Sequence, residues 1–181
     1  MRRRLTIARA LINEPELLLL DEPTTGLDPQ ARHLLWERLY RLKRDGVTLV
    51  LTTHYMEEAE QLCDRLVIMD EGRIVAEGSP RSLIARHSTR EVVELRYASA
   101  EAQEGALARV PGLVEPVGAE RVEPLADRLL IYTDQGDAIA ALLIDDDGGN
   151  GTGDDGHASV LVRRSSLEDV FLRLTGRTLE D

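Results

Sequence analysis

The amino-acid sequence predicts an α/β protein with two parts, and three observations lead to this fold class. A run of four leucines at residues 17–20 is typical of a short strand buried on both faces inside a parallel sheet. The β-branched, apolar run VTLVLT at residues 47–52 predicts a second buried strand. Beyond residue 87 the expected order of elements is β-α-β-β-α-β, the order of a small ferredoxin-like α+β domain.

The first part begins with a predicted amphipathic helix. Leu5, Ala8 and Leu11 repeat at helical spacing, and Asn13 and Pro15 end the pattern, so we expect a helix over residues 1–13. The elements expected after it are the strand at 17–20, a helix at 29–44, the strand at 47–52, a helix at 57–62, a hairpin of strands at 66–70 and 73–76, and a helix at 79–86 that Ser79 caps.

The second part is expected to extend over residues 89–181, with residues 1–88 forming the first. Its predicted elements are strands at 92–97, 113–117, 128–133 and 160–163, and helices at 100–109, 137–144 and 166–174. Residues 145–157, DDDGGNGTGDDGH, are too rich in Gly and Asp to bury a hydrophobic core, so we expect a mobile loop. This run lacks the spacing and terminal Glu of an EF-hand, and no calcium site is assigned to it.

Charge and composition narrow the class of partner. The net charge of −11 comes entirely from residues 91–181, because residues 1–90 hold 14 basic and 14 acidic side chains. This acidic excess argues against nucleic acid and against anionic lipid as a direct partner. The single cysteine, Cys63, fits a reducing compartment and is interpreted as a small buried hydrophobe. No apolar run approaches the length of a membrane span or a signal peptide, so neither is expected.

Three side chains that could carry chemistry follow the two predicted parallel strands. Asp21 and Glu22 come directly after the leucine run, and His54 follows the second strand. In open α/β sheets ligands bind outside the carboxyl ends of the strands, where one acid could hold a divalent cation and the other could activate a water. Two plainer interpretations stay open: the acids could cap the turn at Pro23, and the histidine could be a hydrogen-bonded structural residue.

The segment LLLLDEPTTGLDP, residues 17–29, resembles the Walker B segment and the following D-loop of ATP-binding cassette (ABC) ATPases. The resemblance implies that Asp21 holds Mg²⁺ through water and that Glu22 is the general base for the attacking water. It also implies that His54 is the switch histidine that contacts the γ-phosphate of ATP. The implied cofactors are therefore ATP and Mg²⁺.

The resemblance extends to the D-loop and to the first helix. It implies that Gly26, Leu27 and Asp28 reach across a dimer interface toward the nucleotide of a second ABC ATPase subunit, with a homodimer expected. The helix that follows the family's LSGGQ signature is matched by Arg3, Arg4, Ala8, Arg9, Ala10 and Leu11, whereas only Met1 matches the signature itself. The Walker A loop, G-x-x-x-x-G-K-[ST], does not occur in these 181 residues, and the single lysine, Lys43, lies in another context.

The C-terminal run SSLEDVFLRLTG resembles the end of the accessory domain of drug-export ABC ATPases of the daunorubicin-resistance type. The implied fold is thus the C-terminal half of a P-loop NTPase parallel-sheet domain followed by the accessory domain. The implied function is an ATP-hydrolysing subunit of an exporter, located in the cytoplasm on the inner face of the membrane, that powers a separate membrane permease. Because Walker A is absent, we expect this chain alone to bind ATP weakly or not at all.

Two alternatives to the transport ATPase are considered. The chain could be a non-catalytic truncated cassette that acts as an interaction module through its acidic second part. It could instead be a non-transport ABC ATPase of translation or DNA repair, for which a long coiled coil or basic arms would be expected, and the sequence has neither. The transported substrate cannot be predicted from these motifs, because they are shared by exporters of unlike cargo.

Overall fold

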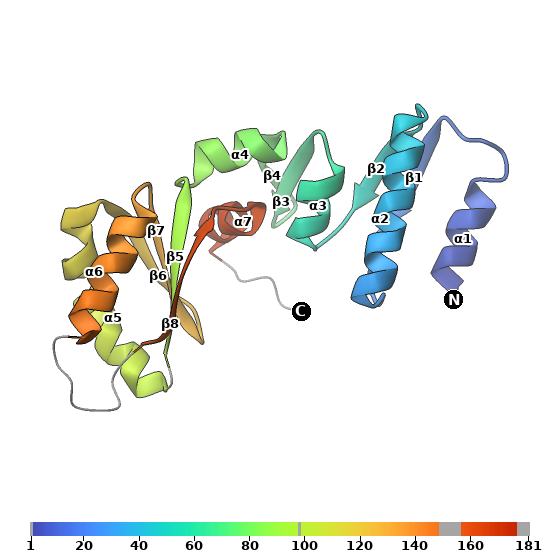
Figure 1. Cartoon of the computed structure of the whole chain (residues 1–181). Coiled ribbons are helices and arrows are strands. Elements are labelled where there is room, and N and C mark those ends of the chain that lie inside the picture. Colours follow the sequence, from blue (N-terminus) through green and yellow to red (C-terminus); the bar gives the residue numbers. More distant parts are fainter. Residues whose placement is uncertain (1, 98, 149–156, 177–181) are drawn as a thin grey trace.

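A computed structural model describes residues 2–97, 99–148 and 157–176 (Figure 1). The mixed α/β class predicted from the sequence is confirmed. The first part comprises α1 (Arg2–Ala10), β1 (Leu17–Asp21), α2 (Pro29–Arg44), β2 (Thr48–Thr52), α3 (Met56–Leu62), β3 (Leu66–Asp70), β4 (Arg73–Gly78) and α4 (Pro80–His87). The second comprises β5 (Glu91–Tyr97), α5 (Ala100–Val114), the 3₁₀ turn η1 (Glu115–Val117), β6 (Ala119–Pro124), β7 (Arg128–Thr133), α6 (Gly136–Gly148), β8 (His157–Arg164) and α7 (Leu167–Thr175).

Strands β1 and β2 pair in parallel, as the sequence predicts. The register places Leu17 opposite Thr48 at one end and Asp21 opposite Thr52 at the other. Helix α2 connects the two strands and crosses one face of their sheet, which is the usual arrangement for a parallel pair (Figure 1). The carboxyl ends of both strands therefore lie at the same edge, where the predicted site residues begin.

Helix α2 supplies the core for this sheet. Its buried Leu35, Trp36 and Leu39 pack against Leu18 and Leu20 of β1. Burial of each large apolar side chain stabilises the fold by about 1.5–3 kcal/mol, so this layer fixes the strand that carries the acids.

The prediction that the leucine strand is buried on both faces is wrong. Leu17 and Leu19 are 52% and 70% exposed, and Val50 of β2 is 52% exposed on the same sheet. Side chains alternate between the faces of a strand, and within the described residues helices cover only the face that holds Leu18 and Leu20. The sequence is apolar enough for two covered faces, but one is open to solvent.

The predicted hairpin after the second strand is confirmed. β3 and β4 pair antiparallel, with an irregularity between Ile68 and Met69. Helix α4 follows with Ser79 as its N-cap, whose hydroxyl accepts the N–H of Ser82 at 3.2 Å, and with Pro80 in its first turn. These caps fix α4 over the hairpin, where Leu83 is completely buried.

The second part contains an antiparallel sheet with the strand order β6-β7-β5-β8 (Figure 1). Alternate residues of its strands face helices α5 and α6. The buried core between sheet and helices comprises Val93, Leu95, Leu129 and Ile131 from the strands and Ala106, Val110, Val114, Ile139 and Leu143 from the helices. The amphipathic helices therefore complete this part, because without them one face of the sheet would expose its leucines and valines.

Two predicted segments of the second part differ from the structure. The strand expected at residues 113–117 is wrong, because α5 continues to Val114 and a 3₁₀ turn follows. Val110 and Val114 lie one helical turn apart and are both buried, so packing outweighs the β-propensity of this run. Of the segment expected as a loop at 145–157, residues 145–148 belong to α6, and His157 begins β8. Residues 149–156 lie outside the described residues.

Helix α7 contacts elements on both sides of the predicted domain boundary. Its Leu167 and Val170 are completely buried in one cluster with Ala59 of α3 and Leu83 of α4. Leu172, on another side of the helix, packs against β5 and β7. The boundary between residues 88 and 89 stays a prediction, and the last helix of the described chain joins the two regions.

A buried ion-pair network holds the start of α7. Arg163 donates to both carboxylate oxygens of Asp169 at 2.7 and 2.9 Å, and the backbone N–H of Ser166 donates to Asp169 at 2.7 Å. Burial opposes ionisation of Asp169, but the hydrogen bonds and charge of Arg163, aided by Ser166, lower the pKa of this carboxyl. Glu94 of β5 accepts a further hydrogen bond from Arg163, so the helix is tied to the sheet.

Candidate functional site

The candidate site begins where β1 and β2 end. The hydroxyl of Thr52 donates to Oδ1 of Asp21, directly across the parallel pair. The backbone N–H of Glu22 donates to the carbonyl of Thr52 at 3.0 Å and lies 3.2 Å from its hydroxyl. Thr52 therefore fixes the backbone and one of the two acids, a role that sequence reasoning did not assign to it.

Glu22 adopts a backbone conformation that is uncommon for a side chain of its type. Its φ of 43° lies in the left-handed region, which costs about 1–3 kcal/mol for a residue other than glycine. Pro23, which is buried, follows at once. Sharp turns of this kind often accompany functional residues.

The Glu22 carboxylate meets the histidine that the sequence places on the neighbouring strand. Nδ1 of His54 lies 3.2 Å from Oε1 of Glu22, and the hydroxyl of Thr25 donates to Oε2 at 3.2 Å. The side chains of Glu22 and His54 are 43% and 38% exposed. Each carboxylate oxygen thus has a protein partner that orients it, while the pair stays accessible to water.

The loop that carries His54 has its own supports. The hydroxyl of Thr53 accepts the N–H of Tyr55 at 3.0 Å, and the rings of His54 and Tyr55 are 4.2 Å apart. The guanidinium of Arg32, on α2, lies 4.4 Å from the centre of the Tyr55 ring. Helix α2 therefore steadies the histidine loop as well as the sheet.

The predicted D-loop residues lie farther along the chain, and the structure shows their contacts within the chain itself. Gly26 has a φ of 73°, a conformation that glycine adopts without strain. Leu27 packs on the α2 core, and Oδ1 of Asp28 accepts the N–H of Ala31 at 2.9 Å as the N-cap of α2. The structure thus brings Asp21, Glu22 and His54 together, and it uses Asp28 to start a helix.

Sequence reasoning missed the hydroxyls that orient the acids. Thr25 lies three residues after Glu22 in the turn, and Thr52 is the last residue of β2. A hydroxyl at the end of a strand that faces an acid is a weak signal in sequence, because Thr is common both in strands and in turns. The register of β1 against β2 was needed to pair Thr52 with Asp21.

The residues present suit Mg²⁺ better than they suit ATP. Mg²⁺ keeps most of its waters and binds through one or two carboxylates, which a single exposed Asp21 beside Thr52 can provide. No group of three or more His, Cys, Asp or Glu capable of closing around a metal occurs in the described residues. A triphosphate needs backbone N–H groups of a Gly-rich loop and a lysine, and the sequence contains no such loop.

Of the helices in the described residues, none is long and apolar enough to cross a bilayer.

Two family models match the chain. The model of the AAA domain, putative AbiEii toxin, Type IV TA system, matches residues 3–58, which include the candidate site. The model of the C-terminal domain of the nodulation factor export protein NodI matches residues 105–176.

Comparison with curated proteins gives relatives over the whole chain. The chain is 48% identical over 180 residues to the Nod factor export ATP-binding protein I of Rhizobium sp. (strain N33), covering 99% of this chain and 54% of that protein. It is also 48% identical over 185 residues to the protein of the same name from Burkholderia thailandensis, covering 100% of this chain and 54% of the relative. The chain therefore spans about half the length of these relatives.

A solved structure entitled "Structure of ATP binding subunit of ABC transporter" is 41% identical, covers 40% of this chain and 30% of that chain, and has a TM-score of 0.37. The relatives span nearly every residue of the chain at close to half identity. The chain belongs to the family of ATP-binding subunits of ABC transporters.

Proposed function

We propose that this chain supplies the water-activating part of an ATP-hydrolysis site in the ATP-binding subunit of an ABC exporter. The observation that carries the proposal is the contact between Oε1 of Glu22 and Nδ1 of His54, made at the carboxyl ends of adjacent parallel strands. A base poised beside an oriented imidazole suits the activation of a water, because phosphoryl transfer depends on positioning more than on covalent chemistry.

In this proposal each residue has one task. Glu22 accepts the proton of the water, and Thr25 and His54 hold its two oxygens in place. Asp21, which accepts a hydrogen bond from Thr52, would hold Mg²⁺ through water. When bound, Mg²⁺ would neutralise phosphate charge. Gly26, Leu27 and Asp28 would face a second cassette.

The phosphate contacts must come from groups that this sequence does not contain. We therefore expect the isolated chain to bind ATP weakly, and isothermal titration of the chain with Mg-ATP is the direct measurement. A dissociation constant in the micromolar range would overturn this expectation. It would also show that the described residues hold a triphosphate by some other means.

The proposed assembly has a permease and a second ATP-binding subunit, at the cytoplasmic face of a membrane. The relatives are named for Nod factor export, so Nod factor is the first cargo to test. We also propose residues 89–181 as a ferredoxin-like accessory domain and residues 1–88 as the cassette part. The strand order β6-β7-β5-β8, with α5 and α6 on one face, supports a ferredoxin-like fold for residues 89–181.

The catalytic role is tested in a complete cassette. Residues 1–181 would replace the matching part of the Rhizobium relative, and Glu22→Gln would be compared with Glu57→Gln, an exposed glutamate on α3. We expect Glu22→Gln to abolish ATP turnover while ATP still drives dimerisation, and Glu57→Gln to retain both. Turnover at the parental rate in the Glu22→Gln chimera would rule out the proposed base.

A second candidate function is a non-catalytic cassette that acts as an interaction module. The absence of a Walker A sequence from these 181 residues favours it. The chimera distinguishes the two, because a chain that has lost catalytic competence would leave the complete cassette inactive even with Glu22 in place.

A further inference from the structure

Polar side chains of α2 contact α3 from its first residue to its last. The α2 residues that make these contacts recur at helical spacing: Arg32, Trp36, Tyr40 and Lys43. They contact, in the same order, Tyr55, Glu58, the carbonyl of Gln61 and the carbonyl of Leu62. Because residues three or four positions apart share one side of a helix, the contacts join one side of α2 to one side of α3. We refer to these four contacts as the α2–α3 ladder.

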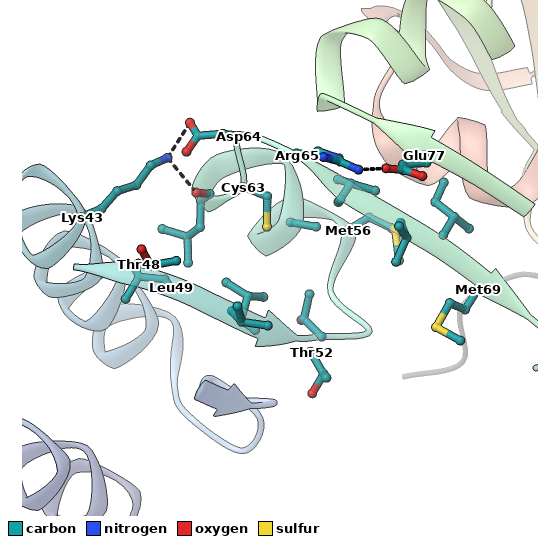
Figure 2. Close-up of a pocket in the computed structure, with 18 of the residues that line it drawn as sticks. Lys43, Thr48, Leu49, Thr52, Met56, Cys63, Asp64, Arg65, Met69 and Glu77 are labelled. Carbon is teal, nitrogen blue, oxygen red and sulfur yellow. Dashed lines mark hydrogen bonds and ion pairs between the residues drawn. The ribbon is translucent and has the colours of Figure 1, made fainter. Parts of the chain in front are cut away.

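The ladder holds both ends of α3. At the start, the guanidinium of Arg32 lies 4.4 Å from the centre of the Tyr55 ring, and Tyr55 is the N-cap residue of α3. At the end, the ammonium of Lys43 donates to the carbonyl of Leu62 at 3.1 Å and to Oδ1 of Asp64 at 2.7 Å, as Figure 2 shows. A cation suits this end of a helix, where carbonyl groups have no partner within the helix. The two end contacts therefore oppose sliding of α3 along α2.

A buried hydrogen bond forms the centre of the ladder. Glu58 is completely buried, Trp36 is 6% exposed, and the indole N–H of Trp36 donates to Oε1 of Glu58 at 3.1 Å. A buried carboxylate costs folding free energy, and an apolar side chain of similar size would fill the same place without that cost. What the carboxylate supplies is direction, because a hydrogen bond depends on angle and so fixes the rotation of α3 about its axis.

Arg32 and Glu58 belong to neighbouring contacts of the ladder. Arg32 lies one turn before Trp36 on α2, and Tyr55 lies one turn before Glu58 on α3. In the described part of the chain, Nε of Arg32 and Oε2 of Glu58 are both buried without a hydrogen-bond partner. The two groups have opposite charge, and charges attract more strongly in the protein interior than in water. This attraction holds α2 and α3 together at the end of α3 that is nearest to His54.

The two helices of the ladder begin at the two loops of the candidate site. α2 starts directly after Asp28, which caps it, and α3 starts directly after His54 and Tyr55. The rings of Tyr55 and His54 are 4.2 Å apart, so the first contact of the ladder continues to the imidazole. Each residue of a helix advances it by about 1.5 Å, and a misplacement of about 1 Å can lower a rate about a hundredfold. The orientation of α3 therefore decides whether His54 reaches Oε1 of Glu22.

We propose that Arg32, Trp36 and Glu58 are positioning residues for His54, and that the ladder makes the predicted D-loop and the histidine loop move as one unit. The three residues act on the site through α3 and Tyr55, and not by contact with the substrate. This inference rests on the proposed function, because its effect on turnover requires that His54 and Glu22 serve ATP hydrolysis. Its structural part, that the buried hydrogen bond sets the place of the His54 ring, can be tested without nucleotide.

The effect on turnover is measured in the chimera with the Rhizobium relative, at a temperature where circular dichroism shows every variant to be folded. Trp36→Phe keeps an aromatic ring and removes the N–H donor. We expect it to lower kcat about tenfold and to change KM for Mg-ATP less than about twofold, because the lost contact positions a reacting group and does not bind phosphate. Glu58→Leu should have the same effect, and the double variant should lose no more than either single variant, since all three lack one hydrogen bond.

Two further variants are the controls for turnover. Glu58→Gln keeps an oxygen that can accept the Trp36 N–H, so its kcat should stay within about threefold of the parental value. Glu57→Leu, at an exposed neighbouring position on α3, should keep the parental kcat. A parental kcat in Trp36→Phe, or losses that multiply in the double variant, would overturn the proposal. If Glu58→Leu does not fold, the comparison of Trp36→Phe with Glu58→Gln decides.

The structural part is tested in the chain itself by NMR of the histidine ring protons, with the His54 signal identified by its loss in His54→Gln. Glu58→Leu changes no aromatic ring, so a shift of the His54 signal reports a displacement of its ring relative to Tyr55. The chain has a single tryptophan, so one indole N–H signal reports on the hydrogen bond to Glu58. We expect both signals to move in Glu58→Leu and neither to move in Glu57→Leu, which removes the same charge one residue away.

The two measurements separate this inference from the proposed function. A His54 signal that stays in place in Glu58→Leu overturns the positioning role, even if the parental chimera hydrolyses ATP. A parental chimera without turnover, together with a moved His54 signal, overturns the proposed function and leaves the structural link between α2 and His54 standing.

Discussion

The backbone N–H of Leu167, at the start of α7, donates to Oε2 of Glu60 on α3 at 3.0 Å. The two residues are 107 positions apart in the chain. A helix N-terminus has unpaired N–H groups and a partial positive charge, so a carboxylate from another element can cap it. Glu60 thereby ties the last described helix to the helix that follows His54.

We predict that Glu60→Ala destabilises the chain by about 1–2 kcal/mol, because it leaves a charge-assisted hydrogen bond to a helix N-terminus unmade. Urea unfolding followed by circular dichroism gives this difference. Glu57→Ala, on the exposed side of the same helix, is the control and should shift the midpoint little. Equal midpoints for the two variants would show that the Leu167 contact does not contribute to stability.

The carboxylate of Asp169 should make stability depend on pH in the acid range. Its pKa is lowered in the folded state, so its contribution is complete above the unfolded value of about 3.9 and is lost as pH falls through the lowered folded value. We expect Asp169→Asn to lower the free energy of unfolding by about 3 kcal/mol near neutral pH. This value is at the low end of the range for a broken buried ion pair, because Glu94 still contacts Arg163.

The measurement for Asp169 is urea unfolding at several pH values. The difference between parent and Asp169→Asn should shrink as the pH falls below about 4. Glu168→Gln, an exposed neighbour on α7, should show no such convergence. A constant difference across the acid range would mean that the Asp169 carboxylate is not the group whose charge stabilises α7.

The open face of the β1–β2 sheet can be tested with two neighbouring leucines. Leu19 is 70% exposed, whereas Leu20 is 7% exposed. We expect Leu19→Lys to change the free energy of unfolding by no more than about 0.5 kcal/mol and to reduce self-association. Leu20→Lys should prevent folding or cost more than about 3 kcal/mol, because it buries an ammonium without a partner. Similar losses from both variants would mean that the face of Leu19 is covered in solution.

Local patterns were sufficient to predict most elements, while burial was not predictable from them. The run at residues 17–20 is apolar throughout, so nothing in it distinguishes Leu19 from Leu20. Which of the two is buried depends on where α2 lies, and that is a property of the whole fold. The same holds for Val114, which was assigned to a strand by propensity and is placed in a helix by the core around it.

The positions of the candidate site residues were easier to predict than burial was, because parallel strands bring their carboxyl ends together. That rule alone brings Glu22 near His54, and the 3.2 Å contact agrees with it. The rule does not say which hydroxyls orient the acids, since Thr25 and Thr52 act through the register and the turn. The proposed roles of all these side chains stay predictions until the chimera is assayed.

The position of α7 also determines when the hydrophobic cluster around α3 and α4 can be completed during synthesis. Leu167 and Val170 fill the cluster around Ala59 and Leu83, yet they leave the ribosome roughly eighty residues after Leu83. Until then the nascent α3 and α4 expose the apolar surface that these side chains cover. During this interval the exposed apolar surface of α3 and α4 is a binding site for chaperones. Packing of α7 against α3 and α4 then buries that surface.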